Sequence, residues 1–170
     1  IHELTHSTRY ISGHGAFNES FAQFVGYRGA RLFFTERGDT EAAKLLDDVW
    51  HDAVLFSRFL QKLTEELRTL YAQPDVTHAH RTAAFTHAQA ELKEVPFTTN
   101  RYTSFSTIEL NNAIILHQMV YADRLGLFEE LLQQHQGDVP HTLATLLHTL
   151  DHTNLPPCGA LESLLRTPPS

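Results

Sequence analysis

A long run of apolar residues at helical spacing constrains the fold of this chain more than any other feature. Between residues 39 and 72, apolar side chains recur every three or four positions, which is the pattern of one buried face on an amphipathic helix. Asp39 is suited to cap such a helix, and Pro74 ends it because proline lacks a backbone N–H. The predicted apolar face consists of Ala42, Leu45, Leu46, Val49, Trp50, Ala53, Phe56, Phe59, Leu60, Leu63, Leu67 and Leu70.

The rest of the chain is also predicted to be helical. Two stretches are predicted to be loops: 11–16, which contains glycines, and 93–107, which contains aromatic residues. We interpret the second as a loop that can form the wall of a cleft. No pair of alternating strands is recognisable, so the predicted fold class is all-α, an antiparallel helical bundle-like array. The predicted helices lie at residues 2–9, 19–37, 77–93, 109–136 (broken near Gly126) and 138–152, followed by a short last turn.

Length and charge narrow the possible functions. The 170 residues are enough for one globular domain, and we predict a single helical domain over residues 1–170. A formal net charge of −7 argues against a nucleic-acid partner, because phosphate contacts need clustered lysine and arginine. No apolar run reaches the length of a transmembrane segment, and the single cysteine, Cys158, cannot form an internal disulfide. The oligomeric state stays open.

The first predicted helix carries a candidate metal motif, "HELTH". His2 and His6 are four positions apart, so on a helix their rings lie on the same face. Two imidazoles so placed can bind one zinc ion, and Glu3 beside them can act as a general base toward a zinc-bound water. With 12 histidines in the chain, this H-E-x-x-H pattern has a chance frequency of roughly 6%.

Glu19 is a candidate for the third protein ligand that catalytic zinc typically has. A glycine-containing loop after His6 lets the chain reverse. With Asn18 as its N-cap, a second helix would place Glu19 in its first turn, where the carboxylate can face back toward the histidines. A stripe of small residues would let the two helices approach closely, although ordinary helix packing explains it equally well; the stripe is Ala22, Gly26, Gly29 and Ala30.

The other histidines form no comparable motif. "HTLDH" at 148–152 has the same four-residue spacing without a glutamate in second position, so we interpret His148 and His152 as surface or capping residues. His14, in the loop after the first helix, is a candidate additional ligand. Such a fourth ligand would be typical of structural rather than catalytic zinc.

Two stretches carry a resemblance to a known family. "HELTH" followed by "AFNESFAQFVGYRGARLF" resembles the predicted zinc aminopeptidases of Gram-negative bacteria, which are gluzincin-type metallopeptidases. The later stretch "LNNAIILHQMVYADRLGLFEELL" is similar to the same family, in which an Asn-Asn pair precedes a tyrosine and a helical Phe-Glu-x-Leu-Leu segment. The middle of the chain matches mainly in its helical character.

The resemblance implies a site and a reaction. His2, His6 and Glu19 would be ligands of Zn²⁺, and Glu3 would be the general base of peptide hydrolysis, in particular of an aminopeptidase with a peptide as substrate. Asn18 would orient the ligands without binding the metal itself, since metal ligands commonly need a hydrogen-bonding partner that fixes their position.

Further residues of these stretches are candidates for contact with the substrate. Tyr121 is the candidate oxyanion donor, since a phenol can stabilise a tetrahedral intermediate, and Tyr102 is its competitor. A core tyrosine is the alternative for Tyr121. Asn111 and Asn112 are candidates for binding the peptide backbone, with a helix cap as the alternative.

The family likeness also implies a larger protein. Family members have a portion before H-E-x-x-H, so we expect an N-terminally truncated metallopeptidase domain with its zinc motif at 2–19 and a helical remainder at 20–166. They usually carry a lipoprotein signal, which implies a periplasmic or membrane-anchored location. Three interpretations stay open: a zinc peptidase, a non-catalytic helical module with structural zinc, and a helical module without metal.

Overall fold

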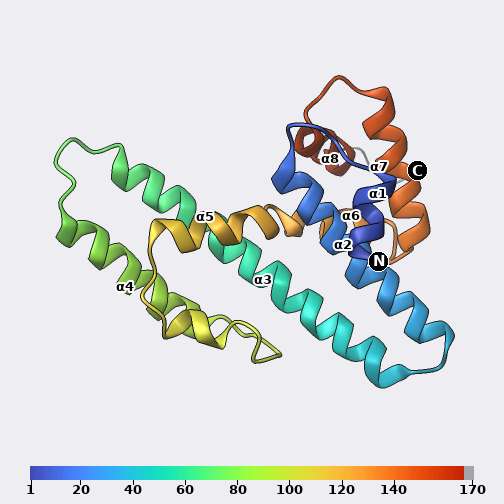
Figure 1. Ribbon diagram of the computed structural model, residues 1–170, viewed down its shortest axis with the longest axis horizontal. Helices are drawn as coiled ribbons and strands as arrows, with labels where there is room; N and C mark the ends of the chain where they lie inside the picture. Colours follow the sequence, from blue (N-terminus) through green and yellow to red (C-terminus); the bar gives the residue numbers. More distant parts are fainter. Residues whose placement is uncertain (167–170) are drawn as a thin grey trace.

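The computed structural model describes residues 1–166, which form helices and connecting loops (Figure 1). No strand occurs within these residues, so the predicted all-α class is confirmed. No helix of this range is both long and apolar enough to cross a membrane. The elements are α1 (His2–Thr8), α2 (Gly15–Glu36), α3 (Thr40–Tyr71), α4 (His78–Glu94), the 3-10 helix η1 (Thr103–Ser106), α5 (Asn112–Tyr121), α6 (Leu125–Gln134), α7 (Val139–His152) and α8 (Pro157–Arg166).

Helix α3 is the longest element and follows the predicted pattern. The Asp39 carboxylate accepts a hydrogen bond from the N–H of Ala42 at 3.0 Å, which caps the helix. The helix ends at Tyr71, before Pro74. Most of the predicted apolar face is buried against other helices: the buried apolar residues of α3 are Ala43, Trp50, Ala53, Val54, Phe56, Phe59, Leu60, Leu63 and Leu67.

Helix α2 is the element on which several others meet, because it packs against α1, α3, α5 and α6. Between α2 and α3 the chain reverses at Gly38, whose φ of +73° is a left-handed conformation that glycine adopts without steric cost. In Figure 1, α1, α6, α7 and α8 gather around α2 at one end of α3, while α4 lies at the other end. The crowded end is the one that contains "HELTH".

The helix predicted across Gly126 is interrupted, but before this residue. Helix α5 ends at Tyr121 and α6 begins at Leu125, so Gly126 lies inside α6. Ser57 of α3 explains the position of the break. Its buried hydroxyl donates to the carbonyl of Ala122 at 2.7 Å and accepts from the N–H of Leu125 at 3.0 Å. One side chain thus satisfies two backbone groups that the break leaves without helical partners.

Two other boundaries differ from the predictions. Helix α2 begins at Gly15 rather than at Glu19, so the chain is already helical at Asn18. The last element, predicted as a short turn, is the ten-residue helix α8. Its Ala160 and Leu161 are buried, and α8 packs against α6 and α7. This packing stabilises a helix that is longer than the short turn predicted from the sequence.

An aromatic cluster joins α2, α3 and α6. The ring of Phe24 lies 5.7 Å from that of Trp50 on α3 and 5.4 Å from that of Phe128 on α6, measured between centroids. Phe17 and Phe21 lie 5.7 and 6.3 Å from Phe128. All five side chains are at most 4% exposed. Such aromatic pairs add about 0.5–1.5 kcal/mol each beyond their buried area, so the cluster fixes α2 firmly on the core.

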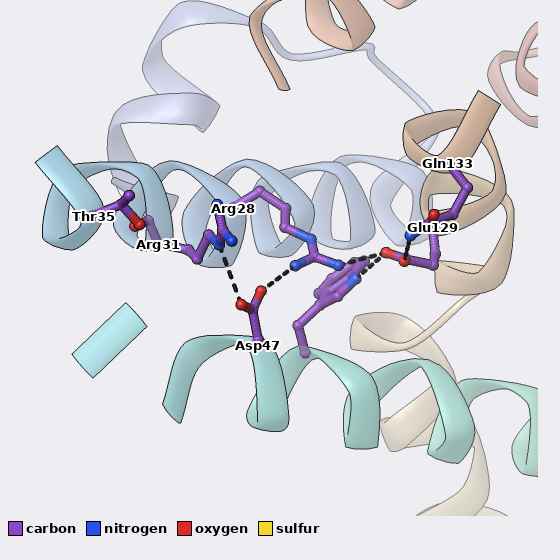
Figure 2. A network of polar contacts seen from close by, with 7 residues as sticks. Arg28, Arg31, Thr35, Asp47, Glu129 and Gln133 are labelled. Carbon is purple, nitrogen blue, oxygen red and sulfur yellow. Dashed lines mark hydrogen bonds and ion pairs between the residues drawn. The ribbon is translucent and has the colours of Figure 1, made fainter. Parts of the chain in front are cut away.

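A charged network beside the cluster ties the same three helices together (Figure 2). Arg28 of α2 donates to Asp47 of α3 at 2.8 Å and to Glu129 of α6 at 2.6 Å. The indole N–H of Trp50 and the amide of Gln133 also donate to Glu129, at 2.6 and 2.7 Å. Burial by itself raises the pKa of Glu129, but the hydrogen bond and charge of Arg28, with the two other donors, hold that pKa below its usual value.

We expect this network to make the free energy of unfolding depend on pH in acid. Because the pKa of Glu129 is lowered by folding from about 4.5, its stabilisation is complete above that pH and is lost as the pH falls through the folded value. Glu129→Gln should therefore cost about 2 kcal/mol at about pH 7 and less at about pH 3. Urea denaturation at both pH values measures the difference, and a cost that does not shrink in acid would contradict the assignment.

Candidate metal centre and adjoining groove

The two histidines of "HELTH" lie on one face of α1. The Nε2 atoms of His2 and His6 are 3.2 Å apart, and their rings meet edge to face with centroids 4.8 Å apart. This follows from their spacing, since side chains four positions apart lie one above the other on a helix. Both side chains are partly buried, with exposed fractions of 32% and 20%.

Glu19 of α2 faces both rings. Its Oε2 lies 3.3 Å from Nε2 of His2, and its Oε1 lies 3.4 Å from Nε2 of His6. Within the described residues, these three side chains form a group of metal-ligating atoms that all lie within 4.8 Å of one another. Glu19 reaches this position from the second turn of α2 rather than from the first turn, where it was predicted.

The spacing of these atoms fits a tetrahedral zinc ion. Bonds of about 2.0–2.1 Å at tetrahedral angles place two ligand atoms about 3.3 Å apart. The distance between the two Nε2 atoms is 3.2 Å, and the distances from each Nε2 to a carboxylate oxygen are 3.3 and 3.4 Å. Imidazole nitrogens and carboxylate oxygens are ligand types that zinc takes in proteins. The residues present therefore fit zinc by distance and by ligand type.

No fourth protein ligand joins this group in the described part of the chain. His14, the candidate additional ligand, immediately precedes α2, and its side chain is exposed. Structural zinc usually has four protein ligands, whereas catalytic zinc has three and an open position. Within the described residues the group therefore has three candidate ligands, two histidines and one glutamate.

Close packing of α1 on α2 brings the three side chains together. A Cβ atom placed on Gly26 would lie 3.6 Å from Cβ of His2 and 3.7 Å from its backbone nitrogen. A Cβ atom on Gly29 would lie 3.6 Å from the side chain of Ile1. Both positions lie at van der Waals distance from the first two residues of the chain, so the stripe of small residues on α2 does receive α1.

Asn18 fixes the connection between these helices and does not cap α2. Its side-chain oxygen accepts from the N–H of Ile11 at 2.9 Å, and its amide donates to the Ile11 carbonyl at 2.8 Å. The predicted N-cap is wrong because α2 extends back to Gly15, which places the 2% exposed Asn18 side chain against the preceding loop. The pair of hydrogen bonds holds the segment that joins His6 to Glu19.

Two polar groups of α1 have no hydrogen-bond partner among the described residues. Glu3 is exposed on α1, and its carboxylate makes no hydrogen bond or ion pair within residues 1–166. The Nδ1 atom of His6 is buried and likewise has no hydrogen-bond partner there. When a histidine binds a metal through Nε2, Nδ1 carries the proton and normally donates it to a neighbour.

A groove of about 760 Å³ adjoins His2. Its walls come from α2, from α5 and from the aromatic-rich loop, so this loop forms a cleft wall as the sequence predicts. The volume is within the usual range of about 300–1,000 Å³ for pockets that bind small ligands. The polar side chains that line the groove include Gln23, Tyr27, Arg101, Tyr102, His117 and Tyr121.

Both candidate tyrosines line this groove. Tyr121, at the end of α5, is 41% exposed, so the alternative of a core tyrosine does not apply to it. Tyr102 is more enclosed, because its ring stacks on that of Phe56 at 4.2 Å between centroids. Burial raises the pKa of Tyr102, although the charge of Arg101 opposes the shift. The Tyr102 hydroxyl therefore stays protonated at neutral pH, as a hydrogen-bond donor must be.

Asn111 and Asn112 do not line the groove at His2. The side chain of Asn111 accepts from the N–H of Ile114 at 3.0 Å, so the capping alternative holds for this residue. The side chain of Asn112 accepts from the hydroxyl of Tyr71 at 2.8 Å. Both face a separate hollow next to α4.

A buried carboxylate not predicted from the sequence anchors the groove loop. Asp52 of α3 is fully buried and accepts three hydrogen bonds: from the N–H of Thr98 at 2.7 Å, and from the N–H and hydroxyl of Thr99 at 2.7 and 2.6 Å. The loop then continues into Arg101 and Tyr102. The signal was present in the sequence, since a charged residue inside an apolar helical stripe is buried only when it is paired.

Gln23, Arg101 and His117 were not predicted as groove residues either. They come from α2, the loop and α5, and no spacing in the sequence connects them. The side-chain amide of Gln23 donates to the carbonyl oxygen of Tyr121, which links α2 to the end of α5. Only the packing of α5 on α2 brings these residues to one surface.

We expect Asp52→Ala to lower the free energy of unfolding by about 3 kcal/mol, because it leaves the buried donors of Thr98 and Thr99 without an acceptor. Asp48→Ala is the matched control on the same helix. The Asp48 carboxylate pairs with Lys44 near the surface, so its loss should cost less than about 0.5 kcal/mol. Urea denaturation compares the two variants. Equal costs would show that Asp52 does not anchor the loop.

The chain matches a family model described as "Putative aminopeptidase" over residues 1–154. No curated protein and no solved structure matches the sequence. The matched range includes α1 to α7, and thus both the metal-ligating group and the groove beside it.

Proposed function

Because the chain belongs to the "Putative aminopeptidase" family, we propose that it is a zinc-dependent aminopeptidase with its site at His2, His6 and Glu19. The observation that carries this proposal is the mutual spacing of the two Nε2 atoms and the Glu19 carboxylate, which suits one zinc ion. The family description supports peptide hydrolysis, and the zinc dependence is our inference from the side chains.

A zinc ion held by the three side chains would supply a Lewis acid for a peptide carbonyl and for the attacking water. The chain's own base is Glu3, which follows His2 directly and has an unpaired, exposed carboxylate. One carboxylate oxygen of Glu3 takes a proton from the water as it attacks the carbonyl carbon. The same group then returns the proton to the amine nitrogen as the C–N bond breaks.

The groove positions the peptide. It adjoins His2 on the side where α2 and α5 meet, so a bound peptide would lie along these helices with its reacting carbonyl near His2. We assign the hydrogen bond to the developing oxyanion to Tyr121, because this side chain is exposed in the groove. Tyr102 instead packs its ring on Phe56 and forms part of the wall.

Two other interpretations make different predictions. A structural zinc would need a fourth protein ligand, and none joins the group within the described residues. A centre without metal would be a hydrogen-bonded cluster, for which the distance of 3.2 Å between the two Nε2 atoms is also suitable. Metal content distinguishes this last possibility from the zinc enzyme.

We expect the protein, purified without an affinity tag and supplied with zinc, to retain about one zinc ion per chain after dialysis. His2→Ala should weaken zinc binding by about 100-fold or more, because it removes a ligand. His148→Ala is the matched control, since His148 and His152 have the same spacing on α7 with no carboxylate at ligand distance. Elemental analysis measures the ratio. A ratio near zero in the unaltered protein, or equal losses in both variants, would refute the zinc centre.

Glu3→Gln should keep the zinc and lower kcat for a short peptide with a free N-terminus by about 10²–10⁴-fold, because it removes the proton acceptor. Glu36→Gln, at the exposed end of α2, should leave kcat unchanged. Release of the N-terminal amino acid and zinc content are measured on the same samples. If Glu3→Gln hydrolyses the peptide at the original rate, Glu3 is not the base.

A further inference from the structure

The groove beside the metal centre contains a single side chain with a permanent charge. Among the described residues that line it, Arg101 is positive, and no aspartate or glutamate is present. The groove therefore offers no carboxylate for a substrate's amino group along these walls. It offers a guanidinium, which is complementary to a carboxylate.

The guanidinium of Arg101 lies near two aromatic rings. Its Cζ atom lies 5.9 Å from the ring centroid of Tyr27 on α2 and 6.0 Å from that of Tyr102. Such contacts use the face of the guanidinium and leave its N–H edges available. A guanidinium has five N–H groups, more than the neighbouring Tyr102 hydroxyl can engage. These contacts favour a position of the Arg101 side chain beside the two rings.

No carboxylate within the described residues neutralises Arg101 through an ion pair. Asp52 anchors the same loop, but its Oδ1 accepts from Thr98 and its Oδ2 accepts from Thr99, and the side chain is fully buried. Three other arginines form ion pairs: Arg28 and Arg31 with Asp47, and Arg124 with Glu162. An unpaired guanidinium that lines a groove is available to bind an anionic group.

We propose that Arg101 binds a carboxylate of the substrate, so that the groove selects peptides with a C-terminal carboxylate or an acidic side chain within its reach. This inference rests on the proposed function, because it names the substrate class of the same groove. A guanidinium binds a carboxylate through two parallel N–H···O bonds, which fixes the direction of the peptide as well as its affinity. The volume of about 760 Å³ suits a short peptide.

Binding of matched peptide pairs tests this inference. The first pair is the tripeptide Leu-Ala-Ala with a free C-terminus and its amide. The second is Leu-Asp-Ala amide and Leu-Asn-Ala amide. Dissociation constants are measured by calorimetry on Glu3→Gln protein, which prevents turnover, both with zinc and after zinc has been removed by a chelator. The zinc-free sample excludes direct binding of the carboxylate to the metal.

We expect the carboxylate member of at least one pair to bind about fivefold more tightly, a modest factor because Arg101 is exposed. Arg101→Met should abolish this preference, and Arg101→Lys should keep part of it. Arg37→Met is the matched control: Arg37 also stacks on an aromatic ring, with Cζ 5.3 Å from the centroid of Phe33, but does not line the groove. Circular dichroism verifies that each variant is folded.

A preference in the first pair assigns the ligand to the C-terminal carboxylate, and one in the second pair assigns it to an acidic side chain. Equal affinities within both pairs for Arg101-containing protein, or a preference that Arg101→Met leaves intact, overturn the inference. Failure of the proposed function gives a different result: no peptide is hydrolysed by protein with intact Glu3, while the carboxylate preference in the zinc-free sample is retained. Peptide hydrolysis without any carboxylate preference refutes only the role of Arg101 and leaves the proposed function in place.

Discussion

The contact between α1 and α2 is the interaction on which the candidate site depends. The short helix α1 carries two of the three candidate metal ligands, and α2 carries the third. A seven-residue helix is too short to be stable alone, so its position comes from packing at Gly26 and from the Asn18 bonds to Ile11. The distances between His2, His6 and Glu19 are therefore a consequence of how closely the two helices approach.

The rest of the fold fixes the position of α2 and forms the groove beside it. The aromatic cluster and the Arg28–Glu129 network fix α2 on α3 and α6. Two buried polar residues of α3 then place the groove walls, since Asp52 anchors the aromatic loop and Ser57 sets the break after α5. These two polar residues interrupt the apolar face of α3 because each satisfies backbone groups of a neighbouring segment.

Local patterns predicted what depends on local spacing. The period of α3 and its Asp39 cap, the shared face of His2 and His6, and the all-α class follow from neighbours in sequence. The start of α2 did not, because an asparagine is as suitable for a loop contact as for a cap, and only the fold shows that Asn18 contacts Ile11. The break between α5 and α6 depends on a serine of α3, which no window around the break contains.

The residues of the groove were even harder to predict from local sequence patterns. Its residues come from separate elements, so the partners of Arg101 could be found only once α2 and the loop were placed side by side. The sequence did indicate that the aromatic loop belongs to a cleft. It gave no indication that the charge of the groove is positive, because one arginine among polar loop residues is usually a solvated surface residue.

X-ray absorption spectroscopy of the zinc-loaded protein tests whether His2, His6 and Glu19 hold the ion, because it reports the atoms bound to the metal. We expect two imidazole nitrogens with oxygen ligands, all at about 2.0–2.2 Å. A first shell with more than two imidazoles, or one with sulfur at about 2.3 Å, would contradict the three-residue centre of His2, His6 and Glu19.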